Sequence, residues 1–292
     1  MFPAECMKSG KFWNRKIISQ EAVPKVLKNK PVKKNIVFFV FFLFVTFGFA
    51  QTKTSNNAIS QKRVTPKSMG YKLIWEDQFN GHDLDTAKWN VRGVGPRRIG
   101  YNSAEAVKVE GGCLKLFALQ KGDSVLAGAV GTAKHFTPKY GYFECRAQLQ
   151  ESIGVWAAFW IQSPEIFKGG DPSTCGAEMD IFEFFKEIGT DTITHAIHWA
   201  YGPNMKSVGP MKSYLKGLSK GFHTYGFEWT PEKYSFFIDG YKFHEQKQGI
   251  SDIPEYLILS MELPETRKSL EKTIFPDVFQ VDYVKVYQKR KP

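Results

Sequence analysis

The sequence is poor in cysteine, with four among 292 residues. Cys6 lies in a basic leading segment, and the other three, Cys113, Cys145 and Cys175, show no zinc-ligand spacing. This pattern argues against a zinc-stabilised fold. Because three cysteines remain, two alternatives stay open: one disulfide with a free thiol, or no disulfide.

Amphipathic helices and internal repeats are also missing. Short alternating or apolar segments are instead separated by Gly, Asn and Asp, and Asp239-Gly240 between two of them is a strong hairpin signal. With 42% hydrophobic and 15% aromatic residues, the chain can bury one large core. We therefore predict an all-β fold, a β-sandwich. Its strands are expected at residues 72–77, 106–109, 113–119, 140–149, 155–162, 179–185, 192–199, 222–229, 234–238, 256–261 and 280–287.

A basic stripe is absent from most of the chain, although the formal charge is +11. Residues 1–34 carry nine Lys or Arg against two Glu, which accounts for +7 of this total. The remaining +4 is mild, and no nucleic-acid-binding motif accompanies it. No nucleic-acid partner is expected.

One long apolar run, residues 36–50, follows Lys33-Lys34 and ends on a small residue before Gln51. This arrangement is typical of a secretory signal peptide, and 15 residues are few for a membrane-spanning helix. A GTG start codon at Val32 would explain the residues upstream. We predict an extension and signal over 1–50, a flexible polar leader over 51–68 and a folded domain over 69–292. The expected location is secreted, periplasmic or outer-surface. The alternative is a membrane anchor with a short basic cytoplasmic tail.

The stretch 176–185 (GAEMDIFEFF) places three carboxylates in an apolar, aromatic run. In a regular strand Glu178 and Asp180 share one face and Glu183 points to the other. One extra residue at Ile181-Phe182, a β-bulge, would return Glu183 to the face of the other two acids. Buried carboxylates are costly unless they are used or partnered, so the stretch is interpreted as catalytic. Retaining glycoside hydrolysis needs two carboxyl groups about 5 to 5.5 Å apart, which predicts a curved, concave sheet here.

Two tryptophans on a neighbouring segment are candidates for sugar contact. Trp156 and Trp160 share one face of the strand predicted at 155–162, while Val155, Phe159 and Ile161 supply the opposite face for the core. The first face is therefore free to form an aromatic platform for substrate.

Three polar residues complete the predicted cleft. His198 lies on a strand that, if it neighbours the acidic one, would bring the imidazole to Glu183; a purely structural role is the alternative. Glu262 falls on the polar face of its strand, where it would accept hydrogen bonds from sugar hydroxyls or form a salt bridge at the rim. Asn102 ends the segment 92–102, which is expected to supply a cleft loop.

The segment EMDIFE at 178–183 resembles the bulged signature of glycoside hydrolase family 16, the laminarinases, lichenases, agarases and carrageenases. The resemblance extends over residues 72–288. Its other matching segments are YGYFECR at 140–146, GVWAAFW at 154–160, FHTYGFEWTP at 222–231, IDG at 238–240 and VDYVKVYQ at 281–288.

This resemblance implies a jelly roll of two curved antiparallel sheets with a concave substrate cleft, in which residues 69–292 form the catalytic domain. It implies Glu178 as the nucleophile, Glu183 as the acid/base and Asp180 as the residue that hydrogen-bonds Glu178. No organic cofactor or catalytic metal is required, and a structural calcium ion on the convex face is compatible with the family. The chain is expected to act as a monomer.

The expected activity is retaining endo-hydrolysis of internal β-linkages in a β-1,3-type glucan or a marine galactan such as agar, porphyran or carrageenan. The bulged motif favours the laminarinase, agarase and carrageenase branches over the lichenases. The segment 92–102 lacks the Asn-Glu pattern associated with laminarinases and carries Arg97-Arg98, which would meet sulfate or anhydro-galactose units or remain a solvated loop. A transglycosylase of the same fold and a non-catalytic carbohydrate-binding jelly roll are the alternatives.

Overall fold

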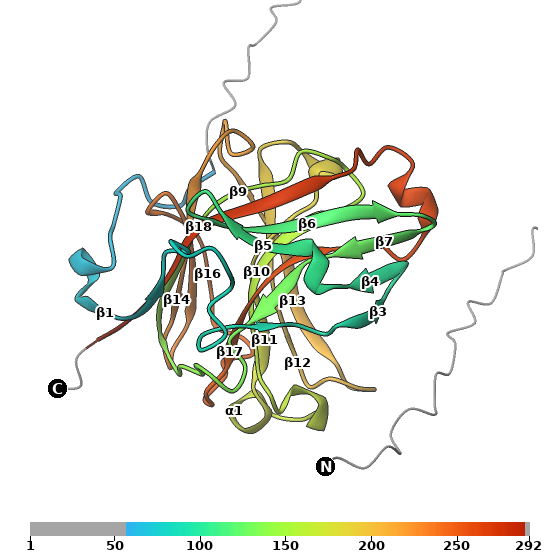
Figure 1. The fold of residues 1–292 in the computed structure, drawn as a ribbon. Helices are drawn as coiled ribbons and strands as arrows, with labels where there is room; N and C mark the ends of the chain where they lie inside the picture. Colours follow the sequence, from blue (N-terminus) through green and yellow to red (C-terminus); the bar gives the residue numbers. More distant parts are fainter. Residues whose placement is uncertain (1–56, 290–292) are drawn as a thin grey trace, which may run out of the picture. The chain divides into compact units, whose positions relative to one another are not determined.

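The computed structural model describes residues 57–289, which form two packed β-sheets (Figure 1). The predicted signal segment and the first residues of the predicted leader lie outside this range. Within it, no helix has the length and apolar character needed to cross a membrane. The helical elements are α1 (Pro172–Cys175) and the 3-10 turns η1 (Lys67–Met69), η2 (Ala104–Ala106), η3 (Ile166–Lys168), η4 (Lys186–Ile188) and η5 (Arg267–Leu270).

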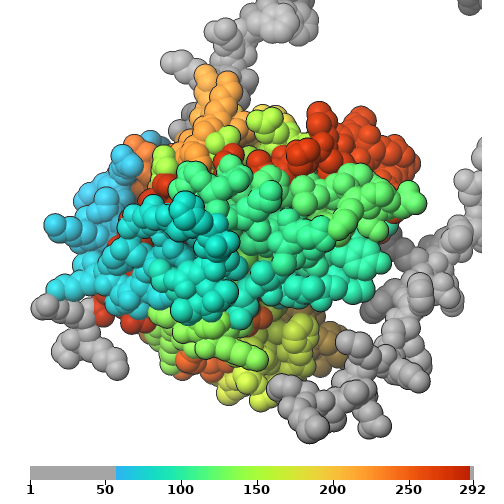
Figure 2. Space-filling view, in the orientation of Figure 1, coloured from blue at the N-terminus to red at the C-terminus, as the bar shows by residue number. Residues whose placement is uncertain are grey.

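The larger sheet has 11 strands. Figure 2 shows the segment from β4 to β7, in teal and green, covering one face of the domain. In sheet order the strands are β16 (Tyr241–Gln246), β15 (Tyr234–Ile238), β14 (His223–Trp229), β9 (Gly141–Gln148), β18 (Asp277–Lys289), β6 (Cys113–Lys121), β7 (Ser124–Ala127), β4 (Gly100–Asn102) and β3 (Gly95–Arg97), with β1 (Tyr71–Asp77) on β18 and β5 (Val107–Glu110) on β6.

The smaller sheet has seven strands. They follow the order β13 (Lys206–Tyr214), β12 (Thr192–Trp199), β11 (Ala177–Phe184), β10 (Trp156–Gln162), β17 (Tyr256–Glu262), β8 (Ala129–Gly131) and β2 (Asn90–Val91). The strand pairs of both sheets are antiparallel, as predicted, except the short pair β4 with β7, which is parallel.

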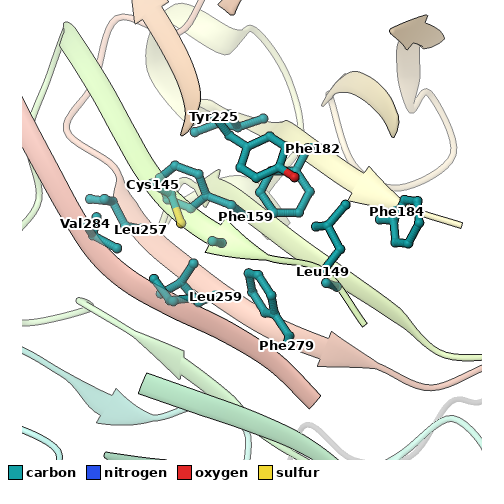
Figure 3. Close-up of a cluster of buried hydrophobic side chains, with 14 of the residues drawn as sticks. Cys145, Leu149, Phe159, Phe182, Phe184, Tyr225, Leu257, Leu259, Phe279 and Val284 are labelled. Atoms are coloured by element: carbon teal, nitrogen blue, oxygen red, sulfur yellow. The ribbon is translucent and has the colours of Figure 1, made fainter. Parts of the chain in front are cut away.

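The core lies between the two sheets and is rich in aromatic side chains. Figure 3 shows Phe159, Phe182 and Leu259 of the smaller sheet facing Tyr225 and Phe279 of the larger one. The ring centroids of Phe182 lie 4.2 Å from Tyr225 and 5.9 Å from Phe279. Full burial of one such side chain contributes about 1.5–3 kcal/mol. An aromatic residue of β11 therefore anchors the acidic strand on the side that faces the core.

The predicted β-sandwich and its strands are confirmed, with boundaries shifted by a few residues. Ranges 192–199 and 234–238 coincide with β12 and β15. The hairpin at Asp239-Gly240 joins β15 to β16, with φ values of 51° and 81° at these two residues. Cys113, Cys145 and Cys175 are all free, so the alternative without a disulfide is the one observed.

The second part of the predicted flexible leader differs from the prediction. Asn57 exchanges hydrogen bonds with Tyr214 of β13, and the Ile59 and Val64 amides donate to the Lys242 and Gly240 carbonyls at 2.8 Å. Residues 57–64 therefore follow the edges of both sheets. Their polar composition gave no sign of this, because the bonds come mainly from the backbone.

Candidate active site

The acidic strand β11 carries a bulge. Adjacent residues of β10 pair with Phe182 and Asp180, so Ile181 is an extra residue on β11. Ile181 and Phe182 both face the core and are 1% and 0% exposed. Glu178, Asp180 and Glu183 consequently lie on the opposite face, where all three line a cleft of about 400 Å³. The predicted bulge is confirmed, together with its effect on Glu183.

A buried histidine of β12 satisfies the backbone of this bulge. His195 Nδ1 donates to the carbonyl of Ile181, and Nε2 lies 2.7 Å from Ser213 Oγ. Burial lowers the pKa of His195 to about 3, so the ring is neutral and accepts at Nε2. A bulge leaves one residue outside the regular ladder, and this imidazole supplies the missing partner. Sequence reasoning did not assign His195 a role.

Glu178 is held by two donors. The Gln162 amide donates to Glu178 Oε2 at 2.6 Å, and the Tyr201 hydroxyl hydrogen-bonds the same carboxyl. The amide is oriented in turn, because Tyr256 and Arg92 both donate to its oxygen, at 2.8 and 3.1 Å. The amide nitrogen must then face Glu178. This carboxylate therefore has fixed donors on the cleft floor.

Glu183 has a different environment. The Trp156 indole N–H donates to its Oε1 at 3.0 Å. Burial, followed by the nearby Asp180 charge, raises the pKa of Glu183 to about 8 and that of Glu178 to about 7. Glu178 receives hydrogen bonds from Gln162 and Tyr201 whereas Glu183 receives one, which favours Glu178 as the carboxylate nucleophile and Glu183 as the protonated acid.

His198 lies in the cleft but contacts a different acid from the one predicted. Its Nε2 is 3.2 Å from Asp180 Oδ2, and its Nδ1 is 2.6 Å from Ser207 Oγ. The predicted contact with Glu183 is corrected, because His198 pairs in register with Glu178, at the opposite end of the acidic motif. The hydrogen bond to Asp180 raises the pKa of His198, while burial raises that of Asp180.

His198 and Asp180, together with Glu178, form the one cluster of potential metal ligands among residues 57–289. Ligand atoms of Glu178, Asp180 and His198 lie within 4.8 Å of one another. Their hydrogen bonds to Gln162 and Ser207 give them another use, which is orientation of the acids. On the larger sheet the described residues provide no such group, so no residues are assigned to the structural calcium ion that the resemblance suggested.

Trp156 and Trp160 both lie on the face of β10 opposite the main core. Trp156 is partly exposed but is not among the residues that line the cleft, whereas Trp160 is buried, at 6% exposure, in a small cluster with Ala158 and Ile258. Trp160 lines the cleft, and its indole N–H donates to Ser260 Oγ at 3.1 Å. An arginine covers each ring. The Arg92 guanidinium lies 4.6 Å from the Trp160 ring centroid, and that of Arg98 lies 4.7 Å from Trp156.

Glu262 also lines the cleft, and the salt bridge is the use that the structure shows. Its Oε2 accepts hydrogen bonds from Arg97 at 2.7 Å and from Arg98 at 2.9 Å, so the alternative in which these arginines belong to a solvated loop is not the one observed.

The prediction that Asn102 lines the cleft is corrected. Its side chain is buried, at 4% exposure, and donates to the Arg92 carbonyl at 3.3 Å. It supports the cleft loop from beneath rather than lining the cleft.

Sequence reasoning missed several cleft residues. Gln162 could have been found, because it continues the alternation of Trp156 and Trp160 along β10. Tyr201 follows β12 in a turn, and Phe167 belongs to η3; neither position carries a periodic signal. They meet across the cleft mouth, with ring centroids 5.7 Å apart.

A second buried carboxyl supports the start of β11. Glu255 is 0% exposed, and its Oε1 accepts from the Ala177 amide at 2.9 Å and from the Ser251 hydroxyl. Its Oε2 has no partner in the described part of the chain. Burial raises the pKa of Glu255 to about 8. A protonated carboxyl thus anchors the residue just before Glu178.

The two-sheet sandwich, the cleft and the bulged acidic strand define the class of the protein, which is a jelly-roll enzyme that acts on glycosidic bonds. A sequence model of glycosyl hydrolases family 16 matches residues 101–268, and the chain belongs to this family, whose enzymes hydrolyse O-glycosyl bonds.

Similar proteins agree with this assignment. Glucan endo-1,3-beta-glucosidase A1 of Niallia circulans is 26% identical over 268 residues, which cover 77% of this chain and 39% of that protein. A keratan-sulfate endo-1,4-beta-galactosidase of Sphingobacterium multivorum is 28% identical, covering 77% of this chain and 57% of that protein. The crystal structure of a laminarinase from Flavobacterium sp. UMI-01 superimposes with a TM-score of 0.63 at 29% identity, over 74% of this chain and 100% of that one. The chain thus spans 39% and 57% of these two curated relatives.

Proposed function

We propose that this protein is a retaining endo-glycoside hydrolase that cleaves internal β-linkages of a β-1,3-type glucan or a marine galactan. The observation that carries the proposal is the bulge of β11, which brings Glu178, Asp180 and Glu183 to one wall of the cleft. Relatives named glucan endo-1,3-beta-glucosidase and beta-porphyranase support the glucan and the marine galactan, respectively.

The proposed reaction is a double displacement. Glu178 attacks the anomeric carbon, and Glu183 gives its proton to the departing glycosidic oxygen, so the C–O bond breaks as the glycosyl ester forms. Glu183, now a carboxylate, then removes a proton from water, and the resulting hydroxide attacks the anomeric carbon and releases Glu178. Asp180 hydrogen-bonds His198 rather than the predicted partner, Glu178, and its charge lies beside both glutamates.

Product analysis tests this function. The wild-type protein is incubated with laminarin, mixed-linkage glucan, agarose, porphyran and carrageenans, and reducing ends are measured. New reducing ends of unchanged anomeric configuration are expected from at least one polymer. Exchange of chain lengths without new reducing ends would identify a transglycosylase, and binding without any product would identify a carbohydrate-binding module.

We also propose that the enzyme is exported, acts as a monomer and requires no organic cofactor. Export is supported by the basic and apolar pattern of residues 33–50. Mass spectrometry of the secreted or periplasmic protein is expected to find an N-terminus close to Gln51. A full-length species in the inner membrane would instead indicate a membrane anchor.

A further inference from the structure

Trp160, which lines the cleft, and Trp156, on the same face of β10, each have an arginine over the ring. Arg92 covers Trp160 and Arg98 covers Trp156, with guanidinium carbons 4.6 and 4.7 Å from the ring centroids. A neutral sugar that stacks on either ring must first displace a cation–π contact. The cleft floor therefore differs from an open aromatic platform.

Each of these stacks lies one hydrogen-bonded residue away from a candidate catalytic carboxyl. Arg92 donates to Gln162 at 3.1 Å, and Gln162 donates to Glu178 at 2.6 Å. Trp156, which Arg98 covers, donates to Glu183 at 3.0 Å. A group that binds these guanidiniums would consequently be near the scissile bond.

The three arginines of the cleft differ in their ion pairs. Arg97 and Arg98 share the Glu262 carboxylate, and Arg98 also contacts Glu265 at 3.1 Å, whose side chain is 78% exposed. Arg92 has no carboxylate within 4.0 Å among the described residues, and the protein atom to which its side chain donates is an amide oxygen. The cleft is also lined by Glu178, Asp180, Glu183 and Glu262, and Arg92 is the one of its three arginines without an ion pair in the described part of the chain.

We propose that the cleft selects a glycan that carries an anionic substituent, a sulfate ester or a carboxylate, which binds the Arg92 guanidinium beside Trp160. The inference rests on the proposed function and narrows its substrate to an acidic polysaccharide. A planar guanidinium presents parallel N–H groups that match the oxygens of sulfate and carboxylate. Stacking on the indole holds this plane in place, so little side-chain freedom is lost on binding.

Binding is measured separately from hydrolysis, with the Glu183→Gln variant and affinity electrophoresis. The polymers are porphyran, the same porphyran after chemical desulfation, polymannuronate for the carboxylate and laminarin as the neutral glucan. Porphyran or polymannuronate is expected to bind about tenfold more tightly than the neutral polymers at low salt. This advantage is expected to fall in 0.5 M NaCl, where the Debye length is about 4 Å against about 30 Å at 0.01 M. The two acidic polymers distinguish sulfate from carboxylate recognition.

Arg92→Met removes the charge and keeps the apolar stem, so it is expected to abolish most of the preference for the acidic polymer. Arg92→Lys keeps the positive charge without the planar guanidinium and is expected to retain part of the preference for the acidic polymer. Arg146→Met is the matched control, because Arg146 also covers an aromatic ring, Phe222 at 4.8 Å, but belongs to the larger sheet and pairs with Asp282.

Equal binding of sulfated, carboxylated and neutral polymers, or an unchanged preference in Arg92→Met, would overturn the proposal. Tighter laminarin binding in Arg92→Met, with binding of the acidic polymers unchanged, would show that the arginine only obstructs a neutral site and would likewise overturn the proposal. Hydrolysis by the wild-type protein is scored independently. A preference for acidic polymers without any hydrolysis would refute the proposed function and leave this inference standing.

Discussion

Glu178 and Glu183 lie on one strand face but receive different hydrogen bonds. Gln162 and Tyr201 both hydrogen-bond Glu178, whereas Glu183 receives one bond, from Trp156. Donors stabilise a carboxylate relative to its acid, so the better-supplied group ionises at lower pH. The division into nucleophile and acid therefore follows from contacts of single side chains.

Substitution of either glutamate tests this division. Glu178→Ala and Glu183→Ala are each expected to lower kcat by at least about a thousandfold, because each removes one half of the double displacement. Azide is expected to restore part of the Glu178→Ala activity and to give a product of inverted anomeric configuration. Circular dichroism establishes that both variants fold. Activity near that of the wild type in either folded variant would exclude the assigned role.

The pH profile tests the same pair without removing either acid. Glu178, with a pKa of about 7, must be ionised, and Glu183, with a pKa of about 8, must be protonated. We expect kcat/KM to rise through pH 7 and to fall through pH 8. Trp156→Phe removes the donor that lowers the Glu183 pKa, so the alkaline limb is expected to move to higher pH while the acid limb stays. Movement of the acid limb alone would contradict the pairing of Trp156 with Glu183.

At the scale of the strand, β11 is held at its start by Glu255 and at its bulge by His195. Both groups are buried, and their raised and lowered pKa values, respectively, keep them uncharged near neutrality. Uncharged polar groups meet the hydrogen-bonding needs of the backbone without the cost of a buried charge. Two such side chains thus define the path along which the three acids are placed.

The state of Glu255 makes stability depend on pH. In the folded chain its carboxyl keeps a proton up to a pKa of about 8, whereas the unfolded chain loses it near 4.5. Between these values the folded state binds more protons, so the free energy of unfolding falls as pH rises, by at most about 1.4 kcal/mol per pH unit. Glu255→Gln is expected to flatten this slope in urea titrations between pH 5 and 8, and Glu265→Gln, at an exposed position, serves as the control. An unchanged slope in Glu255→Gln would show that Glu255 is already ionised.

Sequence reasoning succeeded where a strand has a periodic or apolar pattern and failed where tertiary contacts decide. The bulge was predicted because three acids in an apolar run have one arrangement that places them together. Strand β13 was missed, because Gly209-Pro210 interrupts its pattern; proline is tolerated there since β13 is an edge strand. The arginine–tryptophan stacks were not predicted either, because they join arginines at 92 and 98 to tryptophans that lie about 60 to 70 residues later in the chain.

At the scale of the whole molecule, the described part of the leader connects the two sheets at their exposed edges. Strand β13 ends the smaller sheet and β16 ends the larger one. Asn57 bonds to β13 through its backbone and its side chain, and Ile59 bonds to β16. Edge strands expose unpaired backbone groups that favour association with other chains, and a covering segment prevents this.

Truncation of this segment tests its contribution. A chain that begins at Thr65 loses the bonds of Asn57, Ile59 and Val64 but keeps the hydrogen bonds between Thr65 and Ser68 that precede β1. Each lost bond contributes about 0.5–1.5 kcal/mol, offset by the entropy of ordering an exposed segment, so the free energy of unfolding is expected to fall by about 2 kcal/mol. A chain that begins at Asn57 keeps these contacts and is the matched control.

Because both edges are uncovered together, the shorter chain is also expected to aggregate at lower concentration, as measured by light scattering. If both chains unfold at the same urea concentration and scatter equally, the segment covers the edges without stabilising them. A loss of stability confined to the shorter chain would place the functional start of the folded domain before residue 65, inside the segment that its polar composition predicts to be flexible.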